Sequence, residues 1–184
     1  EDSAVKLCHQ CFGTTAEHVI DPTLLLEKEA YCELIAQDNI PASNGNMMVY
    51  VLDKAPEKQQ IINTVASERG LTPFTVMPEQ NGVYPPVTQW LRGFMDAEYV
   101  VTDSFHGVAF SIIFNKPFIA IGNHGRGLAR FTSVLKMFDL EQRLILSPAE
   151  LTAELINQPI NFDKLNQLKA EKQQFAAVFL DKAL

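Results

Sequence analysis

The run Met47-Met48-Val49-Tyr50-Val51-Leu52 decides the fold, because six residues of strand length follow one another without a polar interruption. A strand with one face in water alternates apolar and polar side chains. This run therefore predicts a strand covered on both faces, as in a parallel sheet. A helix is predicted directly after it, over 56–69, with Pro56 in its first turn and Gly70 just past its end.

The same alternation of strands and helices is predicted along the whole chain. It implies right-handed crossover connections and an α/β fold with a Rossmann-like, doubly wound parallel sheet. We expect one domain over 1–184, closed by a C-terminal helix over 163–184. Ser3 is expected to cap the first helix and Gly13 to end it. The expected strands are 17–20, 47–52, 73–77, 99–102, 118–121 and 144–146, and the expected helices are 3–12, 28–37, 56–69, 87–97, 108–114, 128–138, 148–157 and 163–184.

Composition and charge limit the classes of function. The 184 residues suit one domain with its own core, and no apolar run reaches the roughly 18 residues that cross a bilayer. The net charge of −7 argues against nucleic acid as the main partner. Three cysteines without a ligand pattern predict reduced thiols and no metal site, so we expect a cytoplasmic protein, free or at the inner face of the membrane. The chain opens at Glu1 rather than Met, so an upstream domain or leader can precede it.

The turn Thr102-Asp103-Ser104-Phe105-His106-Gly107 joins a predicted strand to a predicted helix. Ligands of open parallel sheets bind at such turns, and the free N–H groups and dipole of a helix start favour an anion by roughly 0.3–2 kcal/mol. Ser104 supplies a hydroxyl, Gly107 allows close approach of the backbone to a ligand, and His106 is the side chain of this turn that titrates near neutral pH. The alternative is that Asp103 or Ser104 only caps the helix and that His106 is a surface residue.

A second turn, Gly122-Asn123-His124-Gly125-Arg126-Gly127, follows the next predicted strand and would open on the same edge of the sheet. Between Ser104 and Phe138 there is no Asp or Glu, which inverts the negative charge of the chain locally. Arg126 and Arg130 lie four residues apart on one helix face, where either can grip a carboxylate or phosphate through its planar fork. The alternative is an ordinary solvated basic helix face. The basic residues of this stretch are Lys116, Arg126, Arg130 and Lys136.

Other polar residues are given structural roles. We expect His9 and His18 to be surface residues and Trp90 to pack the helix before the 99–102 strand. Asp21 could face the same cleft as the two turns, but a turn cap is the simpler interpretation. The serine and histidine of the first turn lack the flanking glycines of a nucleophile elbow, so a hydrolase triad is not predicted.

The ordered set of motifs resembles the polysaccharide pyruvyl transferase family. The signature is the turn 102–107, followed by Phe110-Ser111 and by Asn115-Lys116-Pro117-Phe118. The pieces that flank it in the same order are Asp21-Pro22-Thr23-Leu24-Leu25, Pro86-Val87-Thr88-Gln89-Trp90-Leu91, Arg126-Gly127 with Arg130-Phe131, and Leu135-Lys136. The resemblance runs from about Glu1 to Leu146 and corresponds to the carboxyl-terminal half of the family's chain.

This resemblance implies the second of two Rossmann-like domains in a glycosyltransferase-B-like enzyme. It implies transfer of pyruvate from phosphoenolpyruvate to two hydroxyls of a free or lipid-linked sugar, as a cyclic ketal of a cell-surface polysaccharide. The donor is a substrate, and no cofactor is expected. His106 matches the family's histidine for catalysis or donor binding, and the isolated chain is expected to be inactive without its N-terminal domain. Some relatives carry arginine where this chain has Ser104, so carboxylate recognition is expected to move to Arg126 or Arg130.

Two other functions remain open at this stage. A nucleotide-sugar glycosyltransferase would share the fold and the basic turn, but it needs a carboxylate for the ribose, for which Glu79 is a weak candidate. A non-catalytic anion-binding module would bind the same ligands without turnover. A ligand-binding measurement separates the glycosyltransferase from the pyruvyl transferase. The glycosyltransferase would bind a nucleoside diphosphate but not phosphoenolpyruvate, and the pyruvyl transferase would bind phosphoenolpyruvate.

Overall fold

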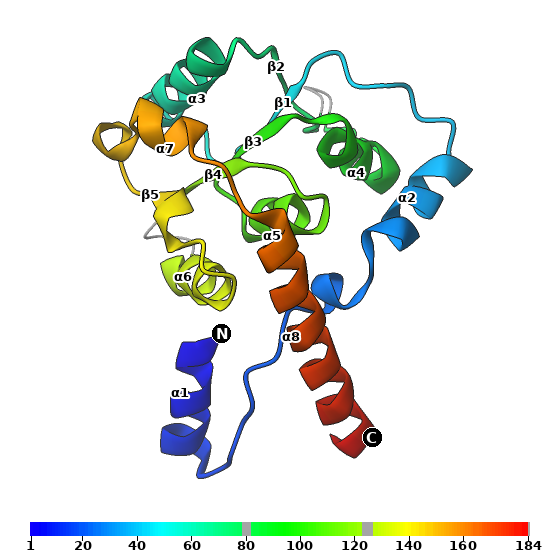
Figure 1. Ribbon diagram of the computed structural model, residues 1–184, viewed down its shortest axis with the longest axis vertical. Helices are drawn as coiled ribbons and strands as arrows, with labels where there is room; N and C mark the ends of the chain where they lie inside the picture. The colour runs from blue at the N-terminus through cyan, green and yellow to red at the C-terminus, as the bar shows by residue number, and fades with distance from the viewer. Residues whose placement is uncertain (79–81, 123–126, 184) are drawn as a thin grey trace.

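A five-stranded parallel sheet forms the centre of the molecule, with helices on both faces (Figure 1). The computed structural model describes residues 1–78, 82–122 and 127–183. The strands lie in the order β2-β1-β3-β4-β5, and every pair is parallel. They span Met47–Tyr50 (β1), Pro73–Phe74 (β2), Tyr99–Thr102 (β3), Phe118–Ile121 (β4) and Leu144–Ile145 (β5).

The helices account for most of the remaining chain. The α-helices span Asp2–Phe12 (α1), Lys28–Gln37 (α2), Pro56–Arg69 (α3), Val87–Asp96 (α4), Phe105–Ile113 (α5), Leu128–Met137 (α6), Ala153–Asn157 (α7) and Phe162–Ala183 (α8). Short 3-10 helices span Pro22–Leu25 (η1), Glu141–Arg143 (η3) and Pro148–Glu150 (η4). Among the described residues, no helix is long and apolar enough to cross a membrane.

The side chains of each strand belong alternately to two separate hydrophobic cores, because successive residues of a strand point to opposite faces of the sheet. One face of the sheet carries Met48, Val100 and Ala120 and is covered by α2, α4, α5, α6 and α8. The opposite face carries residues such as Tyr99 and Val101 and is covered by α3 and α7. The expectation of a Rossmann-like α/β fold is therefore confirmed at the level of the sheet and its layers.

Several predicted elements differ from the structure. Residues 17–20 do not form a strand; they run as an extended segment between α1 and η1, apart from the sheet. Ser3 does not cap α1, which begins one residue earlier with Glu1 at the N-cap position. The helix expected over 148–157 is split at Leu151 and Thr152 into η4 and α7, and the Thr152 side chain caps α7. The helix expected from Val108 begins three residues earlier, at Phe105.

The order of the strands places the point where the chain reverses its direction across the sheet between β1 and β3. From β1 the chain moves outward to β2 on one side and then, through β3, β4 and β5, to the other side. Helices that follow the two central strands consequently lie on opposite faces, and their starting turns diverge at the carboxyl edge. Met47 to Tyr50 pair in register with Tyr99 to Thr102, so the loop after β1 and the turn after β3 leave the sheet at the same level.

Figure 1 shows α1 and the C-terminal part of α8 extending beyond the sheet at the same end of the molecule. α1 packs against α6 and buries none of its own residues. Phe12 at its end is 80% exposed.

Candidate functional site

The turn after β3 begins with two buried side chains that tie the centre of the sheet together. Thr102 Oγ1 donates a hydrogen bond to the Tyr50 carbonyl at 2.7 Å and accepts one from the Ser104 amide at 3.1 Å. Asp103 is 1% exposed, and its carboxylate accepts hydrogen bonds from the Leu52 amide at 2.7 Å and the Asp53 amide at 3.2 Å. Thr102 therefore holds the end of β3 to the end of β1, and Asp103 holds it to the loop after β1.

A buried ion pair completes this connection. Lys58, on the first turns of α3, places its ammonium 2.5 Å from Asp103 Oδ2, and the two side chains are 12% and 0% exposed. A buried charge is stable only when it is paired and hydrogen-bonded, and this carboxylate has three donors. Thr102, Asp103 and Lys58 thus form a buried group, called the frame below, that joins β1, β3 and α3. The Asp103 carboxylate binds the loop after β1 and does not cap α5.

Gly107 lets α5 pack directly on the strand that precedes it. A Cβ atom built at this position would overlap Thr102 Oγ1 and would lie 2.7 Å from Thr102 Cβ, far inside normal contact distance. Glycine is therefore required at this position because α5 packs closely on Thr102 of the same chain. This packing gives Gly107 a structural reason to be present in the motif.

The start of α5 is the part of the turn that has no capping side chain. Ser104 occupies the N-cap position with extended backbone and is 6% exposed, but its hydroxyl makes no capping hydrogen bond. Helix starts leave backbone N–H groups without helical partners, and their dipoles favour an anion. The alternative that Asp103 or Ser104 only caps α5 is therefore not what the structure has, and the first turn offers its N–H groups beside His106.

Phe105, His106 and Arg130 lie together at this helix start. His106 is exposed, and its ring meets the Phe105 ring edge-on with the centroids 5.4 Å apart. The Arg130 guanidinium lies 4.4 Å from the centre of the same Phe105 ring, a distance typical of a cation–π contact. Among the described residues His106 makes no hydrogen bond or ion pair, so its imidazole is free to meet a ligand.

Besides this ring contact, Arg130 forms a weak ion pair with Glu1. Its Nε atom lies 3.6 Å from Glu1 Oε1, and the two side chains are 45% and 37% exposed. Exposed ion pairs of this kind contribute little stability, typically below about 1 kcal/mol. An anionic ligand can therefore replace Glu1 as the partner of Arg130.

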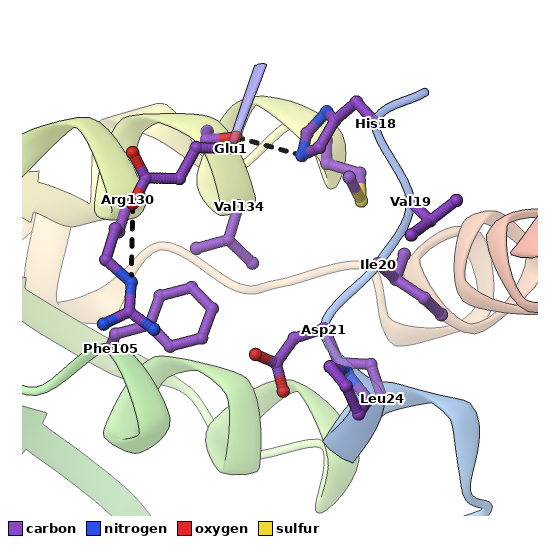
Figure 2. Close-up of a pocket in the computed structure, with 12 residues that line it drawn as sticks. Glu1, His18, Val19, Ile20, Asp21, Leu24, Phe105, Arg130 and Val134 are labelled. Atoms are coloured by element: carbon purple, nitrogen blue, oxygen red, sulfur yellow. Dashed lines mark hydrogen bonds and ion pairs between the residues drawn. The ribbon is translucent and has the colours of Figure 1, made fainter. Parts of the chain in front are cut away.

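A cavity of about 460 Å³ adjoins Phe105 and Arg130. Figure 2 shows it between the extended segment of His18 to Asp21, η1 and α6, with the Asp21 carboxylate directed into it. Apolar side chains such as Val134 and Met137 form part of its wall.

His18 and Ser133 form a hydrogen-bonded pair in this wall. Ser133 Oγ accepts a hydrogen bond from the Asp2 amide at 3.0 Å and lies 3.3 Å from His18 Nε2. Burial lowers the pKa of His18 below its ordinary value, which favours the neutral ring, whose unprotonated nitrogen can accept a hydrogen bond from the serine hydroxyl. The expectation that His18 is a plain surface residue is wrong, since its ring is half-buried and lines the cavity.

Asp21 has two roles. Its Oδ1 atom accepts hydrogen bonds from the Thr23 amide at 3.0 Å and the Thr23 hydroxyl at 2.7 Å, so the prediction of a turn cap is confirmed. The same carboxylate lines the cavity, although the sequence favoured the turn cap over a place in a cleft. The sequence offered one signal for this place: Asp21 is a charged residue between the apolar residues Ile20 and Leu24. Both neighbours are buried in the structure, and a polar residue within a buried apolar segment often marks a site.

The predicted site residues are thus divided by the structure. Ser104, His106 and Gly107 lie on the first turn of α5 or at its cap, and Arg130 reaches this turn through Phe105. His124 and Arg126 fall within 123–126, outside the described residues.

A comparison with protein-family models gives the class of protein. The model for polysaccharide pyruvyl transferase matches residues 1–125, which is more than half of the 184 residues. The match includes the segment of Asp21, all of β1 to β4 and the turn with His106. The chain therefore belongs to the polysaccharide pyruvyl transferase family, a family of transferases. A search among curated proteins found no match to the chain.

Proposed function

We propose that this protein transfers pyruvate from phosphoenolpyruvate to two hydroxyls of a sugar in a cell-surface polysaccharide, forming a cyclic ketal and releasing phosphate. The observation that carries the proposal is the group at the start of α5. There an exposed histidine without a hydrogen bond to the described residues adjoins an arginine that lies over the Phe105 ring and forms a half-exposed ion pair with Glu1, in a chain of this family.

The charge of the donor fits this group. Phosphoenolpyruvate is a compact anion with a carboxylate and a phosphate, and the start of α5 offers backbone N–H groups and the positive end of the helix dipole. Arg130 supplies a planar fork that can donate two parallel hydrogen bonds to either group. Ser104, His124 and Arg126 remain part of the proposed donor site, and no cofactor is needed because the donor carries the reacting bond.

The reaction needs proton transfers that His106 can perform. In the first step a sugar oxygen bonds to C2 of the enol, its proton is removed, and C3 receives a proton. In the second step another hydroxyl of the same sugar displaces phosphate from C2, and its proton leaves with the phosphate. A positioned histidine contributes typically about 10²–10⁴-fold to such transfers. Positive groups around the phosphate stabilise it as it leaves.

The site is proposed to be half of a larger one. Glycosyltransferase-B-like enzymes have two Rossmann-like domains around a cleft, and this chain would supply the domain with the donor turn. Restoring a partner domain would then be required for turnover, and an acceptor attached to a membrane lipid would place the enzyme at the inner membrane face.

The test measures phosphate released from phosphoenolpyruvate by the full-length enzyme, with lipid-linked sugars as acceptors. His106→Gln is expected to lower turnover by at least about a hundredfold. His9→Gln is the matched control, since His9 is exposed on α1, and it is expected to leave turnover unchanged. Equal turnover of His106→Gln and the parent enzyme would overturn the proposed role of His106.

Calorimetry separates this proposal from a nucleotide-sugar transferase. The pyruvyl transferase binds phosphoenolpyruvate, and Arg130→Gln weakens that binding. Binding of a nucleoside diphosphate together with no binding of phosphoenolpyruvate would contradict the proposal.

A further inference from the structure

We propose that the cavity between His18–Leu24, the start of α5 and α6 binds the sugar ring of the acceptor, with the Asp21 carboxylate accepting a hydrogen bond from a sugar hydroxyl. The inference rests on the proposed function for the identity of its ligand. It assigns a second subsite next to the anion site, in which Asp21 is the recognising residue and with which the anion site shares Arg130.

Asp21 is positioned to recognise a hydroxyl. Two donors from Thr23 fix its Oδ1 atom, and Tyr31 donates to the Thr23 carbonyl at 2.8 Å, so the whole turn is held in place. Within the described part of the chain, the Oδ2 atom has no hydrogen bond. Figure 2 shows the carboxylate directed toward the space beside Phe105. A rigid carboxylate oxygen that faces a cavity favours a charge-assisted hydrogen bond from a ligand.

The cavity wall matches the two-sided chemistry of a sugar. A pyranose presents hydroxyls around its edge and C–H groups on its faces. The wall offers polar groups from Asp21 and His18 and apolar surface from Phe105, Val134 and Met137. Its volume of about 460 Å³ lies within the range of about 300–1,000 Å³ that is typical of small-molecule sites.

The cavity lies next to the proposed donor site, so an acceptor bound in it would be close to His106 and Arg130. Phe105 lines the cavity, and its ring also contacts His106 and Arg130. A sugar held against Phe105 would therefore have one edge on Asp21 and another beside the imidazole and the guanidinium. This arrangement leaves hydroxyls of one ring next to the donor, as a cyclic ketal requires.

Saturation-transfer NMR on the protein tests this assignment without turnover. The probes are methyl β-D-galactopyranoside, methyl β-D-glucopyranoside and methyl α-D-mannopyranoside. At least one of them is expected to receive saturation on its ring protons. Asp21→Asn keeps an oxygen for Thr23 but loses the negative charge, and it is expected to weaken binding about ten- to hundredfold. Asp181→Asn changes an exposed carboxylate at the end of α8 and is expected to have no effect.

A second variant keeps the test valid if Asp21→Asn alters the turn. Met137→Trp enlarges a half-buried wall residue on α6 and is expected to exclude the glycosides while the melting temperature stays within a few degrees. Absence of saturation for all three glycosides, or equal saturation in both variants and the parent protein, would overturn the acceptor subsite.

Phosphoenolpyruvate binding distinguishes failure of this inference from failure of the proposed function. Asp21→Asn is expected to keep the affinity of the parent protein for phosphoenolpyruvate, measured by calorimetry, and to raise only the acceptor KM in the full-length enzyme. Turnover of phosphoenolpyruvate with no effect of Asp21→Asn would overturn the subsite and keep the proposed function. Glycoside binding without phosphoenolpyruvate binding would overturn the function and leave a sugar site.

Discussion

The first half and the second half of the turn after β3 differ in what their side chains contact. Thr102 and Asp103 are buried. They are hydrogen-bonded to the end of β1 and to the loop after it, respectively, and Asp103 also pairs with Lys58. The His106 side chain is exposed, contacts the Phe105 ring, and makes no hydrogen bond or ion pair with any described residue. One short motif thus contains both the frame of the sheet and the group that is free for a ligand, so the presence of a motif residue does not by itself indicate contact with substrate.

The largest effect on stability is expected from the frame. Asp103→Asn leaves the Lys58 ammonium buried without its counter-charge, and breaking a buried pair costs about 3–5 kcal/mol. Urea denaturation measures the change in the free energy of unfolding. Asp139→Asn is the matched control: it removes an exposed partner of Lys164 and is expected to cost less than about 1 kcal/mol. Equal losses in the two variants would show that Asp103 does not hold the frame.

A smaller loss is expected from Gly107→Ala. The new methyl group would collide with Thr102, and overpacking of this kind costs about 1–3 kcal/mol. The double variant Thr102→Ala/Gly107→Ala relieves part of the collision. Its unfolding free energy is therefore expected to fall by less than the sum of the two single changes. Strict additivity would contradict direct packing of Gly107 on Thr102.

The exposed half is expected to change binding rather than stability. Arg130→Gln removes a cation beside His106 and is expected to raise the KM for phosphoenolpyruvate about tenfold, because a charged hydrogen-bond donor is lost. Lys136→Gln removes the same charge from an exposed position of α6. It controls for long-range electrostatics and is expected to leave that KM within about twofold.

The smallest effect is expected from Glu1→Gln. The variant releases Arg130 from a half-exposed ion pair, so the unfolding free energy changes by less than about 1 kcal/mol. The affinity for phosphoenolpyruvate, measured by calorimetry, is expected to rise slightly, since the anion no longer competes with Glu1. A fall in affinity would indicate that Glu1 orients Arg130 for the donor.

Local patterns were sufficient to predict the elements that make the sheet. The apolar runs of β3 and β4 and the proline and glycine that bound α3 predicted these three elements with the bounds that the structure has. Residues 17–20 have a strand-like composition but lie apart from the sheet, because a strand also needs a partner edge. Sequence alone carries no information about which edges remain unpaired.

The site was predictable only where its residues are neighbours in sequence. His106 and Arg130 were selected from the helix start and from the acid-free stretch around them. The partners of Asp103 lie 45 to 51 residues away, so its role in the frame had no local signal. Asp21 and His18 reach the cavity from a segment more than 80 residues before Phe105, and only the fold brings them together.

Paired measurement of stability and turnover tests the central claim most directly. The claim is that the motif after β3 divides into a buried frame and an exposed reactive group. His106→Gln is expected to keep the unfolding free energy within about 0.5 kcal/mol of the parent protein and to lower phosphate release from phosphoenolpyruvate in the full-length enzyme by at least about a hundredfold. A variant that loses stability, or one that retains full turnover, would contradict the division.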